Sequence, residues 1–362
     1  MLNQQQSFSD DNQLIEKLLD ITIKQDASDL HIVAENCPVI RVDGDLKYLE
    51  EYGKLSSSQT AQLCYSLMDE RQRERLIQIR EIDFSFPYKD GFRFRANVFY
   101  QKGTISAALR LIKSMEKTFE ELGMPPIIER FTKISHGLVL VTGPTGSGKS
   151  TTLASLINTI NQNRRDHIVT IEDPIEHIFN SNKSLIEQRE VPHDSKDFAA
   201  ALRAALRQDP DVVLIGEMRD LETISAALTV AETGHLVFGT LHTNDAAQTA
   251  DRIINVFPSH QQQQVRTILA NVIEGVVSQR LLKKKGGGRI GACEIMTGSM
   301  AVRSLIREGK AHQLQGVIQT SAADGMITLD KSLADYVRRG VVDLDEALSW
   351  AIDPDNLKTL IV

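Results

Sequence analysis

One stretch of the chain has residue types and spacing typical of a phosphate-binding loop. It runs through Gly143, Pro144, Thr145, Gly146, Ser147, Gly148, Lys149, Ser150 and Thr151. The glycines permit backbone dihedral angles that other residues avoid, and they let the main chain approach a polyphosphate closely. Lys149 supplies a cation for the β- and γ-phosphates, and the Ser150 hydroxyl is a natural Mg²⁺ ligand. The loop therefore predicts a nucleotide site.

The residues on both sides of this loop predict the elements that position it. An apolar run at 138–141 precedes the loop and is typical of a buried strand. The apolar residues that follow it have the spacing of one buried helix face: Leu153, Leu156, Ile157 and Ile160. A strand that turns through glycines into a helix aims backbone N–H groups and the positive end of the helix dipole at one point. An anion is expected at that point.

Three further apolar runs each end in a side chain suited to acid, base or metal chemistry. The runs 168–171 and 236–241 are followed directly by Glu172 and His242, and the run 212–215 is followed by Gly216 and then Glu217. Continuous apolar strands separated by helical patterns predict a mainly parallel sheet. Because ligands of such sheets bind at the carboxyl ends of the strands, these side chains are expected at the same edge as the phosphate loop.

Phosphoryl transfer to water needs a divalent cation, a carboxylate and cationic groups, and the chain offers candidates for each. Glu217 is expected to orient Mg²⁺ or its hydration shell, with Ser150 as a further metal ligand. Glu172, Asp173 and Glu176 form an acidic cluster, one member of which is expected to act as the general base or to orient the water. For any single member, capping of a following helix is the alternative.

Two histidines and three arginines complete the candidate set. His235 and His242 bracket one predicted strand, where imidazole suits either a structural hydrogen bond or a sensor of the γ-phosphate. His242 follows the strand and is the better candidate for a sensor. Arg93, Arg95 and Arg110 lie outside the predicted nucleotide-binding unit, so either a salt bridge or service to a nucleotide bound elsewhere is open for them.

Composition places the chain among soluble globular proteins. Its 362 residues predict two domains, and its net charge of −7 gives no global electrostatic reason to expect a nucleic-acid partner. No apolar run reaches the roughly 18 residues of a membrane span, and the start lacks a signal-peptide pattern, so a cytoplasmic protein is expected. The three scattered cysteines, Cys37, Cys64 and Cys293, fit neither a zinc site nor a disulfide framework.

The expected domains are 1–115, a small α+β domain with short alternating segments, and 137–362, an α/β nucleotide-binding domain. Residues 116–136 suit a linker because they contain a glycine and a proline pair. Beyond about residue 260 the pattern predicts helices, interrupted at 283–288 by a hairpin or flexible turn.

Four motifs in this order resemble those of the secretion-type ATPases, and within that superfamily the PilT/PilU branch of type IV pilus retraction motors. The phosphate loop is similar to the Walker A motif. The other three motifs are similar to the Asp box at 170–176, the Walker B motif at 216–220 and the His box at 233–243. Segments near both ends, 27–31 and 301–308, also fit, so the resemblance covers nearly the whole chain.

The resemblance implies a PAS-like N-terminal domain and a RecA-like ATPase domain followed by helices. It implies a homo-hexamer that binds ATP and Mg²⁺ between its domains, at the cytoplasmic base of the pilus machine. The stroke would act on the inner-membrane platform protein, and a PilU-like accessory ATPase is a further possible partner. By motif match, Lys149 and Ser150 hold phosphate and Mg²⁺, Glu217 is the Walker B acid, and His235 and His242 are the His-box histidines. Arg95 and Arg110 match arginines that reach a phosphate.

One departure and three alternatives remain open. In the C-terminal motif, Val302 and Ser304 stand where the family has isoleucine and asparagine, so a hydrogen bond is expected to be lost there. A pilus-assembly or secretion ATPase is one alternative, although many of those carry a four-cysteine metal module. A scaffold that binds ATP with negligible turnover is another, and a DNA motor is the third.

Overall fold

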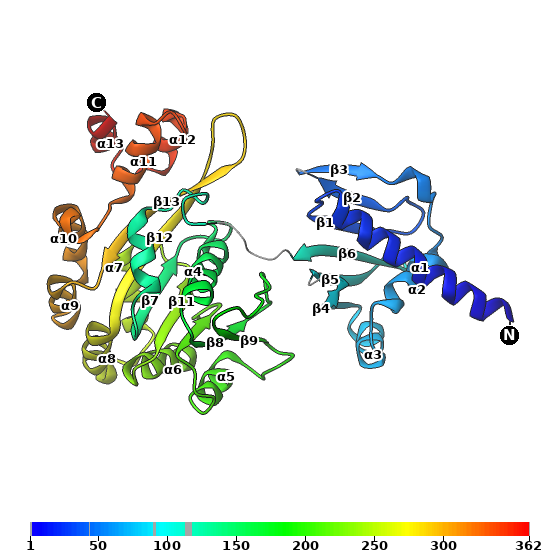
Figure 1. Cartoon of the computed structure of the whole chain (residues 1–362), viewed down its shortest axis with the longest axis horizontal. Helices are drawn as coiled ribbons and strands as arrows, with labels where there is room; N and C mark the ends of the chain where they lie inside the picture. Colours follow the sequence, from blue (N-terminus) through cyan, green and yellow to red (C-terminus); the bar gives the residue numbers. More distant parts are fainter. Residues whose placement is uncertain (1, 43, 90–91, 113–117, 362) are drawn as a thin grey trace. The chain divides into compact units, whose positions relative to one another are not determined.

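The computed structural model describes residues 2–42, 44–89, 92–112 and 118–361. The chain divides into two compact units, Met1–Ser114 and Met115–Val362 (Figure 1). None of the helices that the structure describes combines the length and the hydropathy of a membrane span.

The first unit packs helices against one face of an antiparallel sheet whose strand order is β3-β2-β1-β6-β5-β4. Its elements are α1 (Leu2–Lys24), β1 (Asp29–Ile32), β2 (Val39–Val42), β3 (Asp45–Tyr48), η1 (Glu50–Tyr52), α2 (Ser57–Ser66), α3 (Glu70–Ile79), β4 (Glu81–Tyr88), β5 (Phe92–Gln101) and β6 (Thr104–Ile112). Alternate strand residues such as Phe94 and Leu109 form one core with Leu18 of α1 and Leu63 of α2. The period-two alternation of β5 thus buries one set of side chains and leaves the arginines on the other face.

The second unit is built on a sheet with the strand order β13-β12-β7-β11-β10-β8-β9. All neighbouring strands in it run parallel except β12 and β13. The elements up to β12 are η3 (Pro126–Thr132), β7 (Gly137–Thr142), α4 (Lys149–Asn163), β8 (His167–Glu172), β9 (Leu185–Glu190), α5 (Phe198–Ala205), β10 (Val212–Ile215), α6 (Leu221–Glu232), β11 (Leu236–Leu241), α7 (Ala246–Asn255) and α8 (Ser259–Val272). The remainder are β12 (Ile273–Lys283), β13 (Arg289–Thr297), α9 (Met300–Arg307), η4 (Ala311–Gln313), α10 (Leu314–Thr320), η5 (Ala322–Asp324), α11 (Leu329–Arg338), α12 (Leu344–Trp350) and α13 (Pro354–Ile361).

Helices cover both faces of this sheet, which explains why its strands are continuous apolar runs. In β7, Leu138 and Leu140 face a core shared with α5, α6, α7 and α8. Val139 and Val141 face the opposite core, which contains the α4 residues Leu153, Leu156, Ile157 and Ile160. The predicted mainly parallel sheet, with a helix directly after the phosphate loop, is confirmed.

Two sequence-based expectations need revision in the second unit. The prediction of helices directly beyond residue 260 was wrong for Ile273–Lys283 and Arg289–Thr297, which form the long antiparallel strands β12 and β13. The turn expected at 283–288 does connect them, and helices resume at α9. Residues 116–136 were expected to be a linker. Residues 116 and 117 lie outside the described residues, and 118–136 contain η3, whose Ile128 and Phe131 are buried against the sheet.

Candidate active site

The phosphate loop joins the end of β7 to the start of α4. Gly148 precedes the helix with φ of 89°, and Gly146 has φ of 79°, both in the left-handed region that favours glycine. Gly143 has φ of 142°, and a Cβ there would overlap the carbonyl oxygen of Gln279 on β12. The main chain of the loop is therefore packed tightly against β12, and only glycine fits at its first position.

Two side chains of the loop are suited to an anion. Lys149 Nζ donates to the carbonyl oxygens of Gly143, at 2.9 Å, and of Pro144, at 3.1 Å. Burial lowers the pKa of Lys149, and the negative charges of Glu217 and Glu176 oppose that shift. The Ser147 hydroxyl is buried and has no hydrogen-bond partner among the described residues. A half-buried ammonium and an orphaned hydroxyl beside a helix N-terminus fit a nucleotide phosphate.

Glu172 ends β8 and is buried at the carboxyl edge of the sheet. Its Oε1 accepts hydrogen bonds from Thr170 Oγ1, at 2.6 Å, and from Gln188 Nε2, at 3.2 Å. Burial raises the pKa of Glu172 despite these two donors. A carboxyl group that is held by neighbours and resists ionisation has the properties of a general base or water-orienting group. Asp173 and Glu176 follow it and are exposed.

Glu217 follows β10 and lies against His242, which comes directly after the neighbouring strand β11. His242 Nε2 is 2.9 Å from Glu217 Oε1, and Arg219 also forms an ion pair with this oxygen. The strands β7, β11 and β10 run parallel as neighbours, so Glu217 and the phosphate loop lie at the same edge of the sheet, and the charge of Glu217 opposes the fall in the pKa of Lys149. The structure thus gathers these predicted residues at the carboxyl edge, as the strand pattern indicated.

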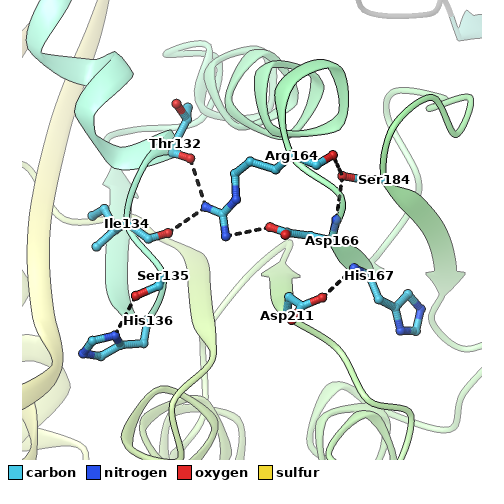
Figure 2. Close-up of polar contacts among 9 residues, drawn as sticks. All are labelled: Thr132, Ile134, Ser135, His136, Arg164, Asp166, His167, Ser184 and Asp211. Carbon is cyan, nitrogen blue, oxygen red and sulfur yellow. Dashed lines mark hydrogen bonds and ion pairs between the residues drawn. The ribbon is translucent and has the colours of Figure 1, made fainter.

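His235 is not part of this group within the chain. It precedes β11, and the seven residue steps from His235 to His242 span about 23 Å at 3.3 Å per residue. His235 Nδ1 is 3.0 Å from the Val230 carbonyl oxygen and 3.1 Å from the Thr233 hydroxyl, which is a structural arrangement. Figure 2 shows other polar contacts at this amino edge, where Arg164 bonds to main-chain carbonyls and Asp211 accepts from the His167 N–H.

Arg95 and Arg110 belong to the first unit, where they are directly opposite each other on β5 and β6. Arg110 Nε is 2.9 Å from Asp29 Oδ1, and Arg95 Nη2 is 3.8 Å from Asp83 Oδ1. Like charges directly opposite each other are unfavourable in a sheet, and here the two aspartates offset part of that repulsion. The side chain of Arg110 is 69% exposed and that of Arg95 is 44% exposed, so both guanidinium groups are accessible to a phosphate. Arg93, two residues from Arg95 on the same face, donates to the Ser85 hydroxyl instead.

Comparison with known proteins places this geometry in a family. The family model described as type II/IV secretion system protein matches residues 4–349. The chain is a member of this family. It is 49% identical over 342 residues to the type IV pilus retraction ATPase PilT of Pseudomonas aeruginosa, covering 94% of this chain and 99% of that one. It is 47% identical to a twitching motility protein of Neisseria gonorrhoeae, over 88% of this chain and 86% of that one.

A solved structure agrees with these relatives. The crystal structure of a pilus retraction motor PilT with bound ADP superposes with a TM-score of 0.88 at 47% identity, covering 95% of this chain and 98% of that one. The chain therefore belongs to the secretion ATPases and, among them, to the type IV pilus retraction ATPases. The family resemblance and the fold expected from the sequence are both confirmed.

Sequence reasoning missed two polar residues of β12 in this secretion ATPase, which support the phosphate loop and the loop that follows β11. Gln279 Oε1 accepts from Thr152 Oγ1 at 2.9 Å, directly beneath the phosphate loop. Arg280 donates to Asn244, two residues after His242. Both residues lie in the segment predicted as helix, so no strand pattern led to them. The strand register alone could have placed them beside the two loops.

The departure in the C-terminal motif lies on α9 and has a local explanation. Val302 is fully buried, whereas Ser304 Oγ donates to Glu308 Oε1 at 2.9 Å, one turn further along. Ser304 therefore keeps a hydrogen-bond partner in its own helix. The adjacent Arg303 bonds to the Gly298 carbonyl at 2.8 Å and to Glu274 at 2.6 Å, which ties α9 to the sheet.

Proposed function

We propose that this chain hydrolyses ATP with Mg²⁺ and uses the energy to retract type IV pili. The observation that carries the proposal is the group formed by Lys149, Glu217 and His242 at the carboxyl edge of the sheet. A phosphate loop alone supports binding. A loop that faces a carboxylate–histidine pair supports hydrolysis and a response to the γ-phosphate.

In this proposal the loop from Gly143 to Thr151 holds the phosphates through its N–H groups and through Lys149, which exchanges its carbonyl partners for phosphate oxygens. Ser150 and Glu217 hold Mg²⁺, which neutralises developing charge on the phosphates when bound. Glu172 orients or deprotonates the attacking water, because its buried carboxyl group favours the protonated state after proton transfer. Asp173 and Glu176 add negative charge at the same edge.

Arg95 and Arg110 are proposed to serve the phosphates of a nucleotide that is held by a loop outside their own unit. Their adjacent positions on β5 and β6 form a fork of two cations, which suits the charge that develops in phosphoryl transfer. His242 is proposed to report the γ-phosphate through Glu217. We assign His235 a structural part, because its contacts lie at the opposite edge of the sheet.

The proposed assembly is a homo-hexamer in the cytoplasm, peripheral at the inner-membrane base of the pilus machine. Its proposed partners are the inner-membrane platform protein and a PilU-like accessory ATPase, with no nucleic acid. The similarity to pilus retraction ATPases over nearly the whole length of both chains supports this assignment. Binding to DNA at about 150 mM salt would contradict the part that excludes nucleic acid.

Steady-state turnover of the purified chain tests the proposal. Mg²⁺-dependent ATP hydrolysis is expected in the wild type and is expected to be abolished in Lys149→Ala, which removes the phosphate-binding cation. Lys133→Ala is the matched control, because Lys133 is an exposed lysine whose ammonium forms an ion pair with Glu129 of η3 at 3.0 Å. An absence of turnover in the wild type, or equal turnover in the two variants, would contradict the proposed function.

A further inference from the structure

Two consecutive residues of β12 link the phosphate loop to the loop that carries His242. Successive side chains of a strand point to opposite faces of the sheet. Gln279 therefore faces α4 and the phosphate loop, whereas Arg280 faces the start of α7. The two residues are also joined directly, because Arg280 Nη1 donates to the Gln279 carbonyl oxygen at 3.0 Å.

Arg280 is buried and bonds to the middle of the loop after β11. Its Nη2 donates to the carbonyl oxygen and to Oδ1 of Asn244, both at 3.1 Å. Only 9% of the residue is exposed, and burial lowers the pKa of the guanidinium. Burying a cation costs free energy unless its N–H groups have hydrogen-bond acceptors. The two bonds to Asn244 and the one to the Gln279 carbonyl oxygen are therefore expected to persist in solution.

The rest of that loop is held at both ends. His242, at its start, contacts Glu217 at 2.9 Å. At its end, the buried Glu294 of β13 accepts from the Ala246 N–H at 3.0 Å and so fixes the start of α7. Asn244 lies between these anchors, and its side chain is bonded to Arg280. Removing the guanidinium would take away both bonds that Arg280 makes to Asn244, while the contacts at the two ends and the Thr243–Thr249 hydroxyl bond at 2.6 Å remain.

The other half of the link reaches the nucleotide site. The Gln279 carbonyl oxygen that accepts from Arg280 is the same atom that a Cβ on Gly143 would overlap. The Gln279 side chain accepts from Thr152 in the first turn of α4. A shift of the phosphate loop would therefore displace the main chain to which Arg280 is bonded.

We propose that Arg280 is a positioning residue: it fixes the loop at Asn244 so that His242 stays within reach of Glu217, and it ties that loop to the strand that walls the phosphate loop. The inference rests on the proposed ATPase function and names the element that aligns its sensor histidine. The bonds that the structure describes for Arg280 go to Gln279 and Asn244, neither of which is a predicted phosphate or metal ligand, so its loss should affect the chemical step more than nucleotide binding.

The test compares Arg280→Met and Arg280→Lys with the wild-type full chain. Methionine keeps the apolar volume, and lysine keeps the charge but lacks the planar fork that reaches three acceptors. We expect kcat for ATP to fall about 10²-fold in Arg280→Met, because misplacement of a catalytic group by about 1 Å has that effect. KM for ATP and Kd for a fluorescent ADP should change by no more than about twofold, and Arg280→Lys should lie between the wild type and Arg280→Met.

Two further variants keep the test decisive. Arg164→Met removes an equally well bonded guanidinium, which donates to the Thr132 and Ile134 carbonyls at the opposite edge (Figure 2). It should lower stability and leave kcat unchanged. Asn244→Ala removes a single acceptor of Arg280. It should lower kcat less than Arg280→Met, and it should add little in the double variant, because both changes break the same link.

The inference is overturned if kcat of Arg280→Met equals that of the wild type, or if kcat falls as far in Arg164→Met as in Arg280→Met. It is also overturned if the affinity of Arg280→Met for the fluorescent ADP falls in proportion to kcat. If Arg280→Met does not fold, wild-type kcat in Asn244→Ala overturns it. An absence of Mg²⁺-dependent turnover in the wild type would instead contradict the proposed function. Mg²⁺-dependent turnover in the wild type, with the same kcat in the Arg280 and Asn244 variants, would contradict only the role of Arg280.

Discussion

Replacing Gly143 with alanine should disable the phosphate loop, whereas the same change at Gly146 should be mild. At Gly146, with φ of 79°, an added Cβ meets no atom within 4 Å, so only the left-handed backbone is penalised, by about 1–2 kcal/mol. At Gly143, with φ of 142°, the added Cβ would overlap the Gln279 carbonyl oxygen and lie 2.7 Å from Ser147 Oγ. Overpacking of this kind adds about 1–3 kcal/mol to the backbone strain.

The assay is thermal unfolding of the purified chain, followed by a probe in the second unit. For a unit of this size, each kcal/mol lowers Tm by about 2–4 °C. The Gly143→Ala variant should therefore unfold several degrees below Gly146→Ala, and both should unfold below the wild type. Gly143→Ala should also lose affinity for a fluorescent ADP by more than about tenfold if relief of the overlap costs the loop at least 1.4 kcal/mol.

Equal Tm values for the two alanine variants would refute this reasoning. They would mean that the loop is not packed against β12 and that Gly143 is needed only for its dihedral angles. A Gly143→Ala variant with wild-type stability and wild-type nucleotide affinity would refute it more strongly, because neither the strain nor the overlap would then exist in solution.

Three other predictions concern the acids and the thiols. The Glu217→Gln variant should keep Kd for the fluorescent ADP within about threefold and lose Mg²⁺-dependent turnover, as measured by phosphate release; retained turnover would contradict its role. Glu172→Gln should also stop turnover. Burial raises the pKa of Glu172 above its value in the unfolded chain, so folding disfavours the carboxylate form. The free energy of unfolding of the wild type, relative to that of Glu172→Gln, should therefore increase as the pH falls through the raised pKa and decrease as the pH rises through it. In denaturant titrations, a stability difference that is constant from about pH 4 to pH 8 would contradict this. A thiol reagent should modify the partly exposed Cys37 quickly in the folded chain. It should modify Cys64 and Cys293 only on unfolding, because both are buried and burial raises the pKa of each thiol to about 12.

The sequence was most informative where local pattern decides structure. Glycine spacing, an apolar run and a helical repeat predicted the phosphate loop between β7 and α4, because those features act within a few residues. The placement of Glu217 and His242 at one edge followed from one topological rule, that the carboxyl ends of parallel strands share an edge, whereas their direct contact was not predicted. Neither inference needed a long-range contact.

The sequence was least informative where pairing between distant segments decides structure. The segment of β12 reads Ile-Glu-Gly-Val-Val-Ser-Gln-Arg-Leu-Leu-Lys, and its apolar pairs suit a helix face as well as a strand buried on both sides. Its pairing with β7 decides the matter, and with it the positions of Gln279 and Arg280. The adjacent positions of Arg95 and Arg110 likewise depend on the register of β5 and β6. His235 was grouped with His242 by motif, although a strand must carry the two to opposite edges.

The most direct test of the central claim is a clean deletion of the gene, scored for surface pili by electron microscopy and for twitching motility. A retraction motor predicts cells with excess pili that do not twitch. The wild-type gene should restore motility, and the Glu217→Gln variant should not. Cells without pili would show that the protein acts in assembly and would contradict the account, as would normal twitching in the strain that carries Glu217→Gln.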